Sequence, residues 1–181
     1  MFLIDADTAL RVLREEDADE LFALTEVNRS YLRRWLPWLD AVTELEDARA
    51  YLATVVARRE AGLGPTFGIR CAGALAGLVG FHRLDRVHRV GDIGYWLAEH
   101  QQGRGVMTEC CRFVVRYGFQ TLDLNRIQIA AATGNVRSRA IPERLGFRQE
   151  GVLRANENLY GTFVDHALYA QLRSEFDAAN R

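Results

Sequence analysis

The sequence predicts a mixed α/β fold, with one mostly antiparallel sheet of about seven strands that carries helices on both faces. Apolar runs of strand length, bounded by turn residues, alternate along the chain with amphipathic stretches of helical length. No composition shift, repeat or low-complexity segment divides the 181 residues. A chain of this length suits one domain, so we expect a single domain over residues 1–181.

Strand and helix patterns alternate in the first half of the chain. Residues 8–13 read as a strand, and the acidic run Glu15-Glu16-Asp17 suits the first turn of a helix, because carboxylates stabilise the positive helix N-terminus. A second helix is expected over residues 45–60. Turn residues then separate three strands that should form an antiparallel meander, at residues 66–70, 74–83 and 90–97.

The second half begins with an amphipathic helix over residues 106–119. Val106, Cys110, Val114 and Tyr117 recur there at helical spacing, and polar residues occupy another face. This helix should pack its apolar stripe on the sheet. The remaining elements are expected to be a strand at 126–132, a helix that ends at Leu145, and strands at 149–153 and 164–171.

A glycine-rich turn, Gln101-Gln102-Gly103-Arg104-Gly105-Val106-Met107, joins the strand at 90–97 to the helix at 106–119. Because glycine lacks a Cβ, the backbone at Gly103 and Gly105 can adopt positive φ and approach an anion closely. The unpaired amides of the following helix point at the same place. The turn therefore predicts a phosphate site, although Gly-x-Gly alone also shapes ordinary tight turns.

A second block of sequence favours the phosphate site over an ordinary tight turn. Asn135-Val136-Arg137-Ser138 and Pro142-Glu143-Arg144-Leu145-Gly146-Phe147 follow the strand at 126–132. The two blocks, in this order and spacing, resemble the GCN5-related N-acetyltransferases (GNAT) over about residues 10–172. Segments 35–39, 125–126, 131–135 and 138–147 further resemble the subgroup that acetylates the N-termini of ribosomal proteins. The resemblance implies the GNAT fold and an acyltransferase in which an amine attacks acetyl-CoA directly.

The resemblance also implies where coenzyme A binds. In the family, pantetheine lies between two diverging strands, here 90–97 and 126–132, whose unpaired backbone groups bond to it. The family's usual Gln or Arg before the first glycine is His100 here, which weakens a side-chain role at that position. The implied cofactor residues are Tyr95, Trp96, Leu97, Gln102, Gly103, Arg104, Gly105, Val106, Met107, Thr108, Asn135 and Ser138.

Two catalytic residues follow from the resemblance. The family's proton-donating tyrosine is Pro142 here, which has no proton to give and frees the Ser138 carbonyl from its helical hydrogen bond. Ser138 matches the subgroup's serine in that role, although a serine at a helix start equally serves as a cap. Asn135 is likewise divided between binding the cofactor and capping the helix. Glu157 matches the subgroup's glutamate, a base that acts through water; without the resemblance it reads as a solvated loop charge.

Acceptor recognition is expected at Trp35 and Trp38, although two tryptophans so close equally suit a core. A carboxylate base is better matched to an α-amine than to a lysine, so the preferred acceptor is a protein N-terminus, and the resemblance implies that of a ribosomal protein. The alternatives are a small amine, such as a polyamine, amino acid or antibiotic, and a non-catalytic acyl-CoA-binding sensor. An acidic set, Asp40, Glu44, Glu46 and Asp47, suits a solvated helix start or a basic protein tail. The subgroup also often forms homodimers.

Composition argues against several other classes of protein. The 23 basic residues nearly balance 24 acidic ones, which leaves no excess charge to grip nucleic acid. No secretory signal or membrane span is apparent, and Cys110 and Cys111 are adjacent, which ordinary disulfide geometry forbids. We therefore expect a cytoplasmic protein whose two adjacent cysteines fill the core. The histidines lack metal-ligand spacing, so no metal site is expected: His82, His88, His100 and His166.

Overall fold

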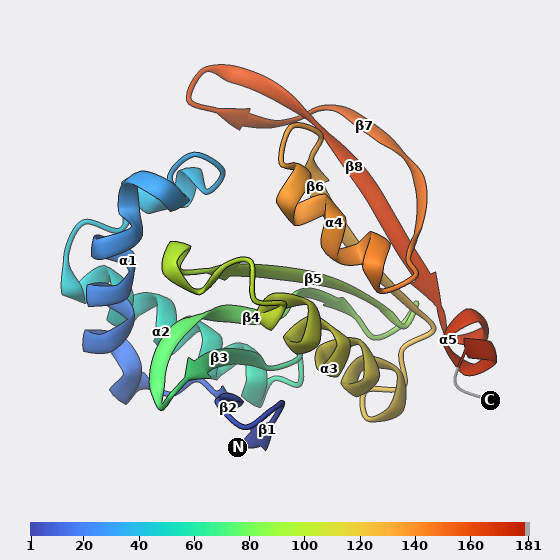
Figure 1. Ribbon diagram of the computed structural model, residues 1–181, viewed down its shortest axis with the longest axis horizontal. Helices are drawn as coiled ribbons and strands as arrows, with labels where there is room; N and C mark the ends of the chain where they lie inside the picture. The colour runs from blue at the N-terminus through green and yellow to red at the C-terminus, as the bar shows by residue number, and fades with distance from the viewer. Residues whose placement is uncertain (180–181) are drawn as a thin grey trace.

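The computed structural model describes residues 1–179 and contains one sheet with the strand order β1-β2-β3-β4-β5-β6-β8-β7 (Figure 1). The predicted mixed fold is confirmed, and the predicted strands are joined by a short additional strand, β1, at the N-terminal edge. The strands are β1 (Phe2–Leu3), β2 (Thr8–Val12), β3 (Thr66–Cys71), β4 (Ala74–Asp85), β5 (Val90–Leu97), β6 (Arg126–Ala132), β7 (Arg148–Leu159) and β8 (Thr162–Leu172).

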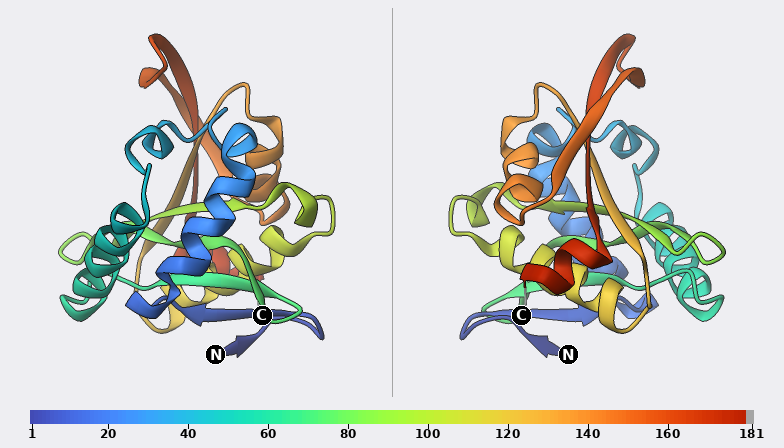
Figure 2. Two further views of the ribbon diagram at one scale, coloured as in Figure 1. Left: turned by 90° about the vertical axis from the view of Figure 1, so that its left-hand side faces the viewer. Right: turned by 90° about the vertical axis from the view of Figure 1, so that its right-hand side faces the viewer.

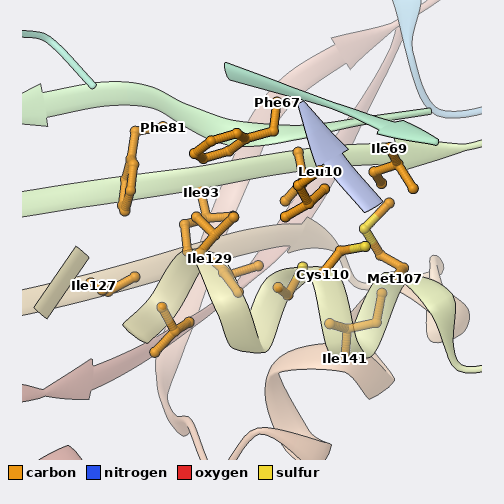
Figure 3. Packing of buried hydrophobic residues seen from close by; sticks show 14 of the residues in the cluster. Leu10, Phe67, Ile69, Phe81, Ile93, Met107, Cys110, Ile127, Ile129 and Ile141 are labelled. Carbon is orange, nitrogen blue, oxygen red and sulfur yellow. The ribbon is translucent and has the colours of Figure 1, made fainter. Parts of the chain in front are cut away.

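Helices cover both faces of this sheet (Figure 2). The α-helices are α1 (Ala18–Leu32), α2 (Leu45–Glu60), α3 (Val106–Gln120), α4 (Val136–Arg144) and α5 (Arg173–Ala179), with 3-10 turns η1 (Glu15–Asp17), η2 (Pro37–Ala41) and η3 (Glu99–Gln101). One core cluster joins α3 and α4 to the sheet through Phe67, Phe81 and Ile141 (Figure 3). A second joins α1 and α2 to Leu78 and Trp96. Successive residues of a strand point to opposite faces of the sheet, so the strands contribute side chains to two separate cores.

The parallel pair β5 and β6 is joined only at one end. Val90–Asp92 pairs with Arg126–Gln128, and beyond these residues the two strands no longer pair with each other. β5 continues beside β4, whereas β6 continues beside β8. The predicted divergence of strands 90–97 and 126–132 is therefore present, and backbone groups on the facing edges of both strands are left for another partner.

The hairpin of β7 and β8 is longer than the sequence predicted. Residues 154–159 were expected to form a loop carrying Glu157, yet they belong to β7, and Glu157 pairs with Val164. The register shifts between Leu153 and Glu157, and Ala155 has a φ of +49°. This bulge interrupts the alternation of the strand, which is why sequence patterning ended β7 too early. The hairpin extends beyond the rest of the fold (Figure 2).

The start of the first helix also differs from expectation. Glu15–Asp17 form a 3-10 turn and α1 begins at Ala18. Asp17 is only 3% exposed, accepts a hydrogen bond from Arg14 N at 2.9 Å and lies 3.1 Å from Arg70 Nη2. The Asp17 carboxylate thus forms a buried cap and an ion pair, and it does not lie in a solvated first turn of a helix.

The predicted helix spanning 45–60 is confirmed in α2. No helix among residues 1–179 is long and apolar enough to cross a membrane. Within that range no group of three or more His, Cys, Asp and Glu side chains is arranged to hold a metal ion.

Candidate active site

A cavity of about 1010 Å³ lies where β5 and β6 part. Its walls come from the end of β5, the glycine turn, the first turns of α3 and α4, and the end of α1. All the sequence-predicted cofactor residues except Arg104 line it: Tyr95, Trp96, Leu97, Gln102, Gly103, Gly105, Val106, Met107, Thr108, Asn135 and Ser138. Arg104 instead donates to Gln101 Oε1 at 2.7 Å on the turn itself.

The glycine turn presents an uncapped helix N-terminus to this cavity. Gly103 and Gly105 have φ values of +75° and +78°, which side chains with a Cβ rarely adopt. Gly105 occupies the N-cap position of α3, and no side chain caps the amides that follow. Since Val106, Met107 and Thr108 line the cavity, the first amides of α3 and its positive dipole end are available to an anion. The residues present therefore fit a pyrophosphate group.

Arginines add positive charge to the same cavity, and sequence reasoning missed them. Arg112 of α3 and Arg137 and Arg144 of α4 line it, and Arg137 donates to Gln102 Oε1 at 2.8 Å. Arg137 and Arg144 lie two helical turns apart, so they share a face of α4. The spacing of these two arginines is the sequence signal that could have identified them. Together with the α3 amides, the arginines suit a ligand that carries several phosphates.

Helix α1 is joined to the glycine turn by contacts that the sequence did not reveal. The buried Asn28 accepts a hydrogen bond from Glu99 N at 2.9 Å, and Tyr31 Oη bonds to Gln102 Nε2. Both contacts connect residues about seventy positions apart in the sequence. They fix the wall opposite α4 relative to the proposed anion site.

Ser138 lies in the first turn of α4 and bonds to Tyr95 of β5. Ser138 Oγ donates to Tyr95 Oη at 3.3 Å, and Tyr95 Oη donates to the Ser138 carbonyl oxygen at 3.0 Å. That carbonyl lacks its helical donor because Pro142 has no N–H. Burial raises the pKa of Tyr95 well above its usual range, so the phenol stays a donor.

Asn135, rather than Ser138, caps α4. Asn135 Oδ1 accepts from Ser138 N at 3.2 Å. The capping role expected of Asn135 is therefore present, and the Ser138 hydroxyl is bonded to Tyr95 instead of to a backbone amide. This arrangement leaves Ser138 at the cavity wall with its hydroxyl oriented by a neighbouring strand.

The remaining predicted site residues are divided between the cavity and its surroundings. Trp35 lines the cavity and lies beside the segment that leads into α4. Its Cη2 atom is 3.4 Å from the position that a Cβ on Gly134 would take. Trp38 is 42% exposed and does not line the cavity. Glu157 does not line it either; its Oε2 atom lies 3.1 Å from Nε2 of His166.

The acidic set near η2 is largely committed to contacts within the fold. Arg33 donates to both Asp40 oxygens, at 2.6 and 2.8 Å, and these hydrogen bonds lower the pKa of Asp40. Asp47 accepts from the amides of Thr43 and Glu44 at the start of α2. Of the two predicted roles, Asp47 therefore has the one at the start of a helix.

Cys110 and Cys111 are core residues, as the sequence predicted, and Cys71 is buried as well. Cys71, Cys110 and Cys111 are buried and free, and none lines the cavity. Burial raises the pKa of Cys110 to about 12 and that of Cys111 well above its ordinary value. Both thiols of the adjacent pair thus stay protonated, which makes them poor nucleophiles.

Comparison with known proteins agrees with this geometry. Residues 8–148 match the family model described as "Acetyltransferase (GNAT) domain". The chain is 36% identical over 177 residues to "Putative ribosomal N-acetyltransferase YdaF" of Bacillus subtilis, covering 96% of both chains. It is 29% identical to a ribosomal-protein-serine acetyltransferase of Escherichia coli, covering 90% of this chain and 91% of that one. Among solved structures, a ribosomal L7/L12 alpha-N-protein acetyltransferase in complex with coenzyme A superposes with a TM-score of 0.90 at 26% identity, covering 96% of this chain and 98% of the other.

Proposed function

Because the chain belongs to the GNAT acetyltransferase family and is an N-acetyltransferase of that type, we propose that its acceptor is the N-terminal α-amine of a protein, and specifically of a ribosomal protein. One observation carries the proposal: a single cavity runs from the uncapped N-terminus of α3 to Trp35 beyond the end of α1. The donor and an acceptor can therefore meet within one space. The names of the relatives in B. subtilis and E. coli support a ribosomal acceptor.

The end of the cavity at α3 suits the coenzyme. The α3 amides and the side chains of Arg112 and Arg137 complement phosphate charge, and the free edge of β5 at Tyr95–Leu97 suits an amide-bearing arm. Acetyl-CoA, when bound, supplies the thioester as the activated acyl group. Since no nucleophilic side chain of the protein need be acylated, positioning of the two substrates accounts for most of the acceleration.

Ser138 and Glu157 have separate roles in this proposal. Ser138 lies at the cavity wall, and its hydroxyl turns from Tyr95 Oη to donate its proton to the leaving sulfur. Glu157 removes the proton of the acceptor ammonium through a water molecule, because its carboxylate lies outside the cavity lining. The neutral amine then forms the new C–N bond as the C–S bond breaks, and the second proton that the nitrogen releases restores the hydroxyl of Ser138.

The acceptor end of the cavity favours a chain over a small amine. Trp35 and Leu36 present apolar surface there, beside the exposed Trp38, and the cavity opens to solvent. An indole ring can pack along an extended peptide backbone while its N–H remains available for a hydrogen bond. A small amine would leave this surface uncovered.

The test is thiol release from acetyl-CoA with matched acceptors. Each peptide carries one internal lysine and has either a free or a formylated N-terminus, and spermidine and free amino acids serve as small amines. Turnover only with free N-termini is the expected result. Acetylation of the lysine or of spermidine would refute the N-terminal assignment, and calorimetric binding of acetyl-CoA without turnover on any amine would favour the sensor.

A further inference from the structure

Two consecutive residues of β8, Asp165 and His166, form side-chain contacts with the bulged segment of β7. Asp165 Oδ1 accepts a hydrogen bond from Ala155 N at 2.8 Å, and His166 Nε2 lies 3.1 Å from Glu157 Oε2. Ala155 has a φ of +49°, a left-handed conformation that a residue other than glycine rarely adopts. Strained backbone of this kind persists where surrounding contacts determine it, and such positions cluster at functional sites.

His166 lies on a strand that is paired on both sides, and most of its side chain is buried. Its side chain is 14% exposed, and it lies opposite Ala132 of β6 on one side and Leu153 of β7 on the other. Its neighbour Asp165 accepts from Thr133 N at 2.8 Å through its carbonyl oxygen. Ala132, the β6 partner of His166, precedes Asn135, the cap of the helix that carries Ser138, by three residues.

The pairing gives Glu157 a defined orientation. A carboxylate on an exposed hairpin is free to rotate, and the Glu157 side chain is 32% exposed. A hydrogen bond from imidazole to one carboxylate oxygen is charge-assisted and holds the side chain in one rotamer. The other oxygen, Oε1, then remains available to a water molecule.

We propose that His166 is a positioning residue for catalysis: its Nε2–H donates to Glu157 Oε2 and holds the carboxylate so that Oε1 faces the water that receives the acceptor proton. The inference rests on the proposed role of Glu157 as the base. His166 itself neither touches substrate nor takes the proton, and no charge moves to it. A displacement of the base by about 1 Å is enough to cost about 10²-fold in rate.

Paired variants that differ in reach test this arrangement. In His166→Gln the side-chain amide reaches about as far as Nε2 does, whereas in His166→Asn the same amide is one methylene shorter. We expect His166→Gln to keep kcat within about 3-fold of wild type and His166→Asn to lower it by about 10-fold to 10²-fold. The KM for acetyl-CoA should stay unchanged in both. Equal kcat values for the two variants would overturn the proposal.

A double variant separates positioning from a structural role. In the Glu157→Gln background there is no carboxylate base to orient, so His166→Asn should cause no further loss of kcat. A further loss as large as in the wild-type background would also overturn the proposal. Melting temperatures check folding; if His166→Asn fails to fold, His166→Ala, which also lacks a donor at this reach, is compared alone and with Glu157→Gln in the same way. A wild-type enzyme that accepts no free N-terminus would refute the proposed function instead.

Discussion

The guanidinium carbon of Arg33 lies 4.2 Å from the centre of the Tyr160 ring. Arg33 follows the last residue of α1, and Tyr160 lies in the turn between β7 and β8. The same guanidinium donates to both oxygens of Asp40 on η2. This contact joins the hairpin that carries Glu157 to the segment that carries Trp35, so it couples the proposed base to the proposed acceptor wall.

Replacing Tyr160 should loosen this connection. A cation–π contact at an exposed site contributes about 0.5–1 kcal/mol, so Tyr160→Ala should raise the KM for an acceptor peptide by about 2-fold to 5-fold. The KM for acetyl-CoA should not change, because the coenzyme residues lie on other elements. Tyr160→Phe keeps the ring and serves as the control in steady-state kinetics; an equal rise in KM for both variants would contradict the role of the ring.

The two tryptophans of the η2 region form a second matched pair. Trp35 lines the cavity and Trp38 does not, although they are three residues apart. Trp35→Ala should therefore raise the KM for the acceptor peptide by about 10-fold, as expected for a buried aromatic contact, and Trp38→Ala by less than about 3-fold. Peptide titrations at saturating acetyl-CoA measure both. A larger effect at Trp38 would move the acceptor path to the outer face of η2.

Substitutions at Tyr95 and Ser138 should affect different properties: the first should lower stability and the second should lower the catalytic rate. Tyr95→Phe leaves the Ser138 carbonyl without a donor, because Pro142 cannot supply one, and should lower the free energy of unfolding by about 1–3 kcal/mol. Ser138→Ala keeps that carbonyl bonded and removes only the hydroxyl. It should lower kcat by about 10-fold or more with little change in stability. Urea unfolding and single-turnover kinetics give the two quantities, and an unaffected kcat in Ser138→Ala would remove the serine from the mechanism.

Glu157→Gln removes the proposed base while keeping the size of the side chain and one acceptor oxygen. We expect kcat to fall by about 10²-fold, with the dissociation constant for acetyl-CoA unchanged because Glu157 does not line the coenzyme cavity. Calorimetry and thiol-release assays on the same preparation give both values. Unaltered turnover would mean that solvent alone deprotonates the acceptor.

Elements with local signals were predicted well from the sequence. The bounds of α2, β5 and β6 agree with prediction to the residue, because turn residues or helix caps flank each one. Residues 154–159 fell outside the predicted strands at 149–153 and 164–171 and were therefore expected to form a loop. Their strand character comes from pairing with β8, which no local window contains.

The same distinction applies to the candidate site. The glycine turn and the Asn135-to-Ser138 block are each contiguous in sequence, so both could be predicted to line the cavity where the structure brings them together. Tyr95 as the donor to Ser138, and His166 as the partner of Glu157, depend on how distant strands and helices meet. The freed carbonyl of Ser138 was foreseeable from Pro142, but the residue that satisfies it was not.

The stability of the sheet edge near α1 should depend on pH through Glu20. Burial raises the pKa of Glu20, but hydrogen bonds from Leu75 N and Arg70, each at 2.7 Å, outweigh this effect and leave the pKa below its usual value. The folded state therefore binds fewer protons than the unfolded state in this range. This contribution to stability is complete above the unfolded pKa and is lost as pH falls through the lower, folded pKa. Urea unfolding between about pH 6 and pH 3 should show a steeper decline for wild type than for Glu20→Gln, and parallel curves would show that Glu20 is not linked to folding.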